Sequence, residues 1–307
     1  MIGFEIIKSG IFTLLQDRGR FGLTHLGVSN SGVMDEYASL IAHKMLGNSL
    51  EDNLLVVVFG NIELKAHGST VLCVTGAKCE FFVNDVSVDT WKNVKLNSGD
   101  IIKIGKILEG QRVYLAVKSG FDIKKEFSSN STTVKEELGG INGMQLKKGE
   151  FLPYKSSESC INNRLKQNFI PSYDEEILTL RVVLGYQEDN FSQEEKNKFF
   201  SSIYDVTADF NRMACRLKGE AIHSSLDGII SEGICFGAIQ IPKNGQPIIL
   251  LKERQTIGGY PKIGSVLSID CFKLAQRKVG SHVRFEKINI TDAQKKLKDF
   301  YNIFKNE

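Results

Sequence analysis

The sequence predicts a mainly β protein with a few helices. Short apolar runs rich in Val, Ile, Phe and Leu recur along the chain, and these residue types favour strands over helices. Turn-forming residues separate the runs, as in Asn84-Asp85, Ser98-Gly99-Asp100 and Asn244-Gly245. The 307 residues leave room for about two domains at roughly 150 residues each. Short strands at this spacing are typical of barrels or sandwiches.

Six segments carry the strand pattern clearly. They cover residues 54–59, 70–74, 80–83, 113–117, 180–184 and 248–251. Each is a run of apolar and β-branched residues that ends at a polar or glycine-containing turn. The segments fall in both halves of the chain, so we expect a β-rich core in each half.

Three helices are expected between the strands. Residues 34–46 place apolar side chains at 34, 37, 38, 41 and 45, which is the spacing of one helix face, and Gly47 follows as a stop. This helix should pack on a barrel. The segments from Ser192 and from Thr291 both match the capping box, so a helix should follow each. The second would run nearly to the C-terminus with Ala293, Leu297, Phe300, Tyr301 and Phe304 on one face.

A polar stretch divides the two β-rich halves. Residues 154–176 are rich in Ser, Asn, Lys and Glu, with little apolar periodicity. We therefore expect a first half over residues 1–155, a second half over 177–290 and a C-terminal helix over 291–307. Residues 111–120 and 246–259 resemble each other weakly as strands that lead into glycine turns, which leaves an internal duplication open as an alternative.

Composition excludes several classes of protein. Hydrophobic residues make up 42%, charged residues 24%, and the net charge is only +3, so neither disorder nor nucleic-acid binding is expected. The N-terminus lacks the features of a secretory signal, and no apolar stretch is long enough to span a membrane. We expect a cytoplasmic protein without a membrane partner. The six cysteines and five histidines are scattered, so we expect buried reduced thiols and no metal site.

The first candidate site follows the strand at 248–251. Cations, a tyrosine and a pair of glycines stand together there, namely Arg254, Gln255, Gly258, Gly259, Tyr260 and Lys262. Glycines allow a ligand to approach the backbone N–H groups, while Arg254 and Lys262 could hold an anion. The alternative is a glycine-containing hairpin with a solvated charged rim.

The second candidate site precedes the first expected helix. It comprises Gln16, Asp17, Arg20, His25, Ser31 and Asp35. Free N–H groups at a helix N-terminus favour an anion such as phosphate or carboxylate. The structural alternatives are that Ser31 only caps the helix and that Asp17 and Arg20 only form an ion pair.

Weaker candidates are dispersed along the chain. They are Thr75, Gly76, Arg212, Glu232 and Gln240. The chain has no G-x-x-x-x-G-K-[ST] loop, no dinucleotide-binding G-x-G-x-x-G after a strand and no G-x-S-x-G elbow. It is therefore not an evident ATPase, dehydrogenase or hydrolase of those types.

Taken in order, these motifs resemble one family, known as the C subunit of 5-oxoprolinase, KipA, allophanate hydrolase subunit 2 or biotin-dependent carboxyltransferase. The resembling segments are 16–22, 25–28, 31–35, 47–48, 74–77, 114–117, 237–242, 245–247 and 254–262. The resemblance implies two cyclophilin-like β-barrel halves. Five positions depart from the family pattern: Val56, Asn61, Asn130, Tyr186 and Phe236.

The resemblance also implies a function with partner proteins. It indicates the C subunit of a 5-oxoprolinase, which acts with a KipI-like B subunit and an A subunit to open 5-oxoproline to glutamate in a reaction that consumes ATP and uses Mg²⁺ with it. One alternative is transfer of a carboxyl group from carboxybiotin to urea or a similar small amide. No A-M-K-M-type segment is present, so biotin would arrive on another chain. Another alternative is a regulatory protein that binds a KipI-like kinase inhibitor.

Within the 5-oxoprolinase hypothesis, charge assigns roles to the candidate residues. Arg20, Arg254 and Lys262 would clamp phosphate and the substrate carboxylate. Asp17 would orient Arg20 or hold Mg²⁺, and Glu232 would act as a base. We expect the loops 16–35 and 254–262 to converge on one anion-binding site. The remaining candidates would bind substrate or nucleotide. Prolyl isomerase activity is not favoured, since fold does not carry function.

Overall fold

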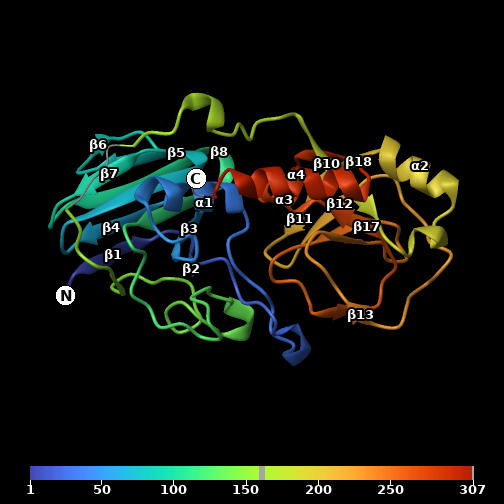
Figure 1. The fold of residues 1–307 in the computed structure, drawn as a ribbon, viewed down its shortest axis with the longest axis horizontal. Helices are drawn as coiled ribbons and strands as arrows, with labels where there is room; N and C mark the ends of the chain where they lie inside the picture. Colours follow the sequence, from blue (N-terminus) through green and yellow to red (C-terminus); the bar gives the residue numbers. More distant parts are fainter. Residues whose placement is uncertain (159–162, 306–307) are drawn as a thin grey trace. The chain divides into compact units, whose positions relative to one another are not determined.

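The computed structural model describes residues 1–158 and 163–305. Contacts divide the chain into two units, one formed by Met1–Arg20 with Ser31–Asp174 and the other by Phe21–Asn30 with Glu175–Glu307. Strands form the body of each unit (Figure 1), which confirms the predicted mainly β fold class. The loop 21–30 belongs to the second unit although its neighbours in sequence belong to the first.

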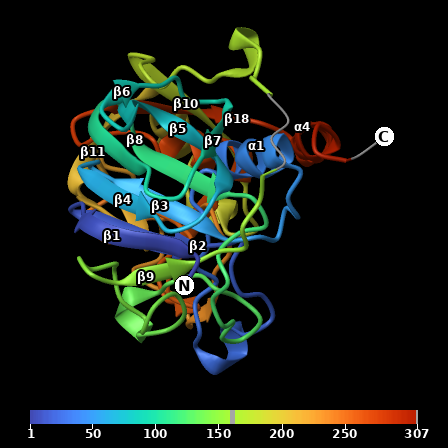
Figure 2. The ribbon, with the colours of Figure 1, turned by 90° about the vertical axis from the view of Figure 1, so that its left-hand side faces the viewer.

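A nine-stranded antiparallel sheet forms the first unit. Its strands are β1 (Gly3–Ser9), β2 (Phe12–Gln16), β3 (Leu54–Val58), β4 (Ile62–Ala66), β5 (Thr70–Val83), β6 (Val86–Ser87), β7 (Asn93–Leu96), β8 (Ile101–Val117) and β9 (Phe151–Pro153). The long strand β8 pairs with β3, β4 and β5 and so joins the parts of the sheet. In Figure 2, β1, β4, β8 and β5 can be followed across this sheet.

The two strands predicted at 70–74 and 80–83 are one continuous strand, β5. Its pairing with β8 shifts register between Gly76 and Phe81, and Gly76 has a φ of +85°. Bulges of this kind bend a strand without ending it. The prediction of two strands was wrong because Lys78 interrupts the apolar pattern at the bend.

The helix α1 (Glu36–Leu46) packs against β5 and β8, as expected from its apolar face. Asp35 caps it by accepting a hydrogen bond from the backbone N–H of Ala38, and Gly47 ends it in a left-handed conformation. The cap is therefore Asp35 rather than Ser31, because the chain only enters the helix at residue 36. Met34 is buried just outside it.

Burial of His43 in α1 makes stability depend on pH. Its side chain is 1% exposed, its Nε2 has no hydrogen-bond partner in the described structure, and burial lowers its pKa to about 4. The unfolded chain takes up a proton near pH 6.5, whereas the folded chain does so only near pH 4. The unfolding free energy should therefore keep its full value above pH 6.5 and fall by up to about 3 kcal/mol as the pH is lowered toward 4.

Urea unfolding of the wild type and of His43→Leu at pH 7, 5.5 and 4.5 measures this contribution. The difference in unfolding free energy between the two proteins should change as the pH falls, with the wild type losing more stability, because leucine does not titrate. His223→Gln, at an exposed position, is the matched control and should run parallel to the wild type. If the unfolding free energy of the wild type changed with pH in the same way as that of His43→Leu, the prediction would be contradicted.

A closed seven-stranded barrel forms the second unit. In order around the barrel its strands are β10 (Ile177–Leu184), β17 (Lys262–Val266), β14 (Ala238–Gln240), β15 (Ile248–Leu250), β12 (Ala214–Lys218), β11 (Ile203–Phe210) and β18 (His282–Lys287). All pairs are antiparallel except β10 with β18. A separate pair, β13 (Glu232–Gly233) with β16 (Ile257–Gly258), stands outside the barrel.

Three α-helices among the described residues accompany the barrel. The prediction for α2 (Gln193–Ser201) is confirmed, with Ser192 as its cap. The helix α4 (Ile290–Asn302) also exists, but its cap is Asn289, which accepts from the N–H of Asp292. The predicted cap at Thr291 was wrong because the helix begins one residue before it. The short helix α3 (Ser268–Leu274), which has no side-chain cap, was not predicted.

The cysteines differ in their exposure. Cys73, Cys215 and Cys271 are buried, as predicted, and Cys79 is half-buried. Cys235 is exposed, so the expectation of burial was wrong there: it lies in the short connection between β13 and β14. Cys160 lies outside the described residues. No helix in the described part of the chain is long and apolar enough to cross a membrane.

Candidate functional site

Asp17, directly after β2, organises a loop of the first unit. Its carboxylate accepts hydrogen bonds from the N–H of Gly19 at 2.8 Å and of Asn130 at 2.6 Å. The hydroxyls of Ser129 and Ser131 donate to it at 2.6 Å each. The side chain is 5% exposed. Four donors around a buried carboxylate make Asp17 a strong internal anchor.

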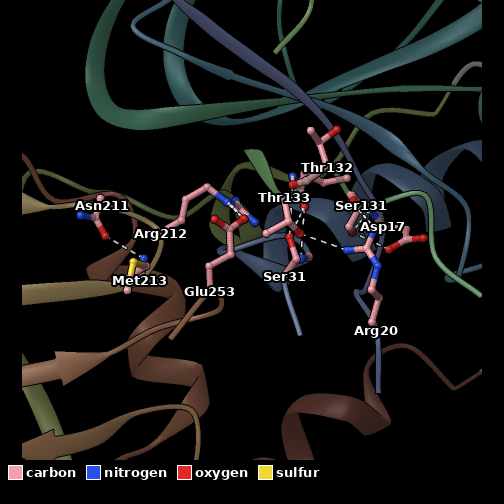
Figure 3. Close-up of polar contacts among 12 residues, drawn as sticks. Asp17, Arg20, Ser31, Ser131, Thr132, Thr133, Asn211, Arg212, Met213 and Glu253 are labelled. Atoms are coloured by element: carbon pink, nitrogen blue, oxygen red, sulfur yellow. Dashed lines mark hydrogen bonds and ion pairs between the residues drawn. The ribbon is translucent and has the colours of Figure 1, made fainter. Parts of the chain in front are cut away.

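Arg20 and Gln16 bind the same loop from neighbouring positions. The Arg20 guanidinium donates to the carbonyl of Ser131 at 2.5 Å and to Thr133 Oγ1 at 3.1 Å, as Figure 3 shows. Gln16 Nε2 donates to the carbonyl of Thr132 at 2.7 Å. The loop 129–133 is thus held by three of the predicted site residues, all buried.

Ser31 and Asp35 stand at the entrance to α1. The Ser31 hydroxyl lies 3.3 Å from the carbonyl of Thr132. Asp35, besides capping α1, accepts a hydrogen bond from the hydroxyl of Tyr173 at 3.0 Å. Burial, and next the charge of Asp35, raise the pKa of Tyr173 well above its usual value. The phenol of Tyr173 therefore stays protonated and holds Asp35 in place.

Thr75 and Gly76 lie where β5 bends. Thr75 Oγ1 donates to the carbonyl of Ala38 and so ties β5 to α1. Gly76 lines a cavity of about 370 Å³ together with Trp91 and Tyr173. A Cβ atom at Gly76 would lie 2.4 Å from the carbonyl oxygen of Arg112, so glycine is required by the packing.

In the second unit, Glu232 and Lys262 form an ion pair. Tyr186 also donates to the Glu232 carboxylate, and Gln187 Nε2 donates to it at 3.0 Å. These donors, Lys262 first, lower the pKa of Glu232. Gln187 also accepts from the backbone N–H of Lys262 at 2.8 Å. A carboxylate with a lowered pKa is a weaker base, so this geometry suits Glu232 to orienting Lys262.

Arg254 is a buried cation held by neutral groups. It is 9% exposed, and its guanidinium donates to the carbonyls of Ile234 at 2.9 Å and Leu251 at 3.2 Å and to Asn30 Oδ1 at 2.9 Å. Burial lowers its pKa, yet arginine remains charged in proteins. Among the described residues no carboxylate pairs with it. Three of its five N–H groups are engaged, so two have no partner among the described residues.

Strand pairing brings further predicted residues next to this cluster. Glu232 lies opposite Gly258 in the β13–β16 pair, and Gln240 lies opposite Lys262 in the β14–β17 pair. The Gln240 amide nitrogen is buried without a hydrogen-bond partner in the described structure. A Cβ atom at Gly258 would lie 2.7 Å from that nitrogen. Glycine at 258 therefore lets the backbone pack closely against an unused donor.

The other predicted residues are less engaged with this cluster. Arg212 pairs with Glu253 at 2.5 Å, as Figure 3 shows. Gln255, Tyr260 and His25 are exposed, and His25 lies in a short 3-10 helix (Thr24–Leu26). Gly259 packs near the carbonyl of Ile229. Asn30, from the loop 16–35, bonds to Arg254, and the convergence of the two loops on one anion site stays a prediction.

No group of three or more His, Cys, Asp or Glu side chains that could hold a metal occurs in residues 1–158 and 163–305. Asp17, the residue expected to hold Mg²⁺, already accepts four hydrogen bonds. Its environment does not fit a Mg²⁺ ligand, which needs free carboxylate oxygens. We therefore assign no step on this chain to Mg²⁺.

Sequence reasoning missed Tyr186 and Gln187 as partners of Glu232 and the loop 129–133 as the partner of Asp17. The available signal for the loop was its run of hydroxyl and amide side chains, residues 128–133. Such residues are suited to donating to a carboxylate. Tyr186 was noted only as a departure from a family pattern.

The chain is similar in sequence to a known family of protein domains. Residues 26–287 match the model of the carboxyltransferase domain, subdomains A and B. The chain belongs to this carboxyltransferase-domain family. The C subunit of the 5-oxoprolinase of Escherichia coli K12 is 31% identical over 303 residues, which cover 98% of this chain and 96% of that protein. The corresponding 5-oxoprolinase protein of Haemophilus influenzae is 31% identical over 282 residues, or 92% and 90% of the two chains.

Larger enzymes contain the same carboxyltransferase domain. The urea amidolyase of Saccharomyces cerevisiae is 28% identical over 97% of this chain, which spans 17% of that enzyme. The crystal structure of Kluyveromyces lactis urea carboxylase matches 99% of this chain with a TM-score of 0.91, at 24% identity and over 29% of that chain. That likeness establishes the fold. These relatives are parts of enzymes, and their names alone do not determine the reaction of this chain.

Proposed function

We propose that the protein is the C subunit of a 5-oxoprolinase. It would act with a KipI-like B subunit and an A subunit to convert 5-oxoproline, ATP and two waters to glutamate, ADP and phosphate. The observation that supports this proposal is 31% identity to the C subunit of a 5-oxoprolinase over nearly the whole length of both chains. The urea enzymes instead carry the domain as a small part of a longer chain.

The chemistry needs anion-binding groups, which the second unit supplies. The lactam of 5-oxoproline is an unactivated amide, and transfer of a phosphoryl group to its oxygen makes the ring carbon more electrophilic. Water then adds to that carbon and the ring C–N bond breaks, with the electron pair and a proton going to nitrogen, which leaves an acyl phosphate. A second water hydrolyses the acyl phosphate to the carboxylate of glutamate and free phosphate. Charge on the phosphoryl oxygens must be balanced throughout. In the proposal Arg254 and Lys262 bind such oxygens or the substrate carboxylate.

Each residue near this site has a separate role in the proposal. Arg254 contributes two N–H groups on a guanidinium fixed by three internal bonds. Glu232, Tyr186 and Gln187 fix the position of Lys262. Gln240 offers an amide donor, and Gly258 packs closely beside it. Asp17, Arg20 and Gln16 maintain the shape of the loop 129–133 in the first unit.

Reconstitution tests the proposal. The full chain, combined with purified A and B subunits, 5-oxoproline and Mg-ATP, should release glutamate and ADP in equal amounts. Omission of this chain should remove glutamate release. If the complete mixture made no glutamate, although all three proteins were folded and co-purified, the proposal would be wrong.

A second candidate function is carboxyl transfer, favoured by the match to the carboxyltransferase domain and to the fold of urea carboxylase. In that case a biotinylated carrier protein charged with carboxybiotin would lose its carboxyl group to urea when this chain and its partners were added. Release of labelled carboxyl product without glutamate formation would favour this second function over the first.

A further inference from the structure

A cavity in the second unit lies beside the Glu232–Lys262 pair. It has a volume of about 370 Å³ and runs between the strands β10 and β17 and the helix α4. This size falls at the small end of the range for small-molecule sites, about 300–1,000 Å³. The proposed function gives a ligand to Lys262 at one end of the cavity, but neither it nor the family match assigns a ligand to the rest of the cavity.

The walls of the cavity are largely apolar. Val183 and Leu184 of β10 and Val266 of β17 form one side, and Ala293 and Leu297 of α4 form the other. Water in such a space makes few hydrogen bonds, so an apolar ligand of matching size would displace it favourably. The body of a ligand for this cavity is therefore hydrocarbon.

One end of the cavity is polar and holds an ammonium group. Lys262, Gln187 and Tyr186 line it. Lys262 Nζ bonds Glu232 and no other group of the described chain, which leaves N–H groups for an acceptor. The N–H groups of Lys262 that Glu232 does not use favour a ligand head group rich in acceptor oxygens, such as a carboxylate.

We propose that this cavity binds a medium-chain monocarboxylate, with the hydrocarbon tail between β10, β17 and α4 and the carboxylate at Lys262. The ligand class follows from an apolar cavity of limited volume that has one ammonium group, that of Lys262, at its polar end. The ligand would share Lys262 with the anionic substrate of the proposed function, but the observations that carry this proposal are the walls of the cavity and not the reaction.

Cys235 provides a direct readout of occupancy. Its exposed thiol lines the cavity and lies 3.7 Å from the hydroxyl of Ser265. A ligand in the cavity should shield it from a maleimide. The full chain carrying Cys160→Ser would be labelled, and mass spectrometry of the peptide that contains Cys235 would give the labelling rate. Octanoate below its micellar concentration is the probe, with octanol and acetate as comparison ligands.

Octanoate should slow the labelling of Cys235 at least fivefold, octanol less, and acetate not at all. Ala293→Phe should fill the cavity and abolish protection, whereas Lys295→Phe, on the exposed side of the same helix, should retain it. Lys262→Met should raise the octanoate concentration needed for protection at least tenfold while leaving that of octanol unchanged.

Three outcomes would overturn the proposal. One is the absence of protection by octanoate in the Cys160→Ser protein. Another is equal protection in Ala293→Phe and Lys295→Phe, which would indicate non-specific binding elsewhere. The third is stronger protection by octanol than by octanoate, which would exclude a carboxylate head. Because the readout is labelling, a failed glutamate assay leaves this test unaffected.

Discussion

Replacing Asp17 by alanine should lower the free energy of unfolding by about 3–5 kcal/mol, because four donors, three of them buried, lose a charged acceptor at once. Domains are usually stable by only about 5–15 kcal/mol, so this variant should be close to unfolding. Asp17→Asn should be milder, at about 2 kcal/mol, since one carbonyl oxygen remains while the new NH₂ group faces donors.

Urea unfolding followed by circular dichroism measures both variants. Asp122→Ala, which removes an exposed carboxylate of the same unit, is the control and should change the unfolding free energy by less than about 0.5 kcal/mol. If Asp17→Ala were as stable as Asp122→Ala yet abolished glutamate release, Asp17 would be catalytic and its structural role would be wrong.

Local sequence patterns predicted the strands and the first helix well, because their signals lie within a few residues. The apolar face of α1 and Gly47 placed that helix to within two residues at its start. The patterns failed where a distant partner decides the outcome. The bend at Gly76 depends on pairing with β8, and α3 depends on Asp270, which accepts three hydrogen bonds from Arg181 of β10.

The candidate site could likewise be predicted from the sequence only in part. Charge and glycine content indicated the segment 254–262, and Arg254 is a buried cation with unused donors. The sequence could not show that Asp17 is engaged by Ser129 and Ser131, more than a hundred positions away. Nor could it show that Tyr186 and Gln187 surround Glu232, because only closure of the barrel brings β10 beside β17.

Replacing Arg254 by alanine should reduce glutamate release by the reconstituted complex at least a hundredfold. A buried guanidinium without a carboxylate partner is costly to maintain, and in the proposed function the N–H groups left over from its three internal bonds bind an anion. Hydrogen bonds to charged groups contribute about 1.5–3 kcal/mol each, so losing two of them accounts for a factor of this size. Arg216→Ala, at an exposed position in the same unit, is the control and should retain the wild-type rate.

Arg254→Lys separates anion binding from folding. Alanine also removes the bonds to Ile234, Leu251 and Asn30, so Arg254→Ala should unfold at lower urea concentration than the wild type. Lysine keeps the charge and most of the volume, but an ammonium cannot reproduce the planar set of donors. Arg254→Lys should therefore fold and bind the B subunit. Its rate of glutamate release should nevertheless be at least tenfold lower than that of the wild type, and its KM for the anionic substrate should be higher. A folded Arg254→Lys with wild-type kinetics would leave Arg254 with a purely structural role in its loop.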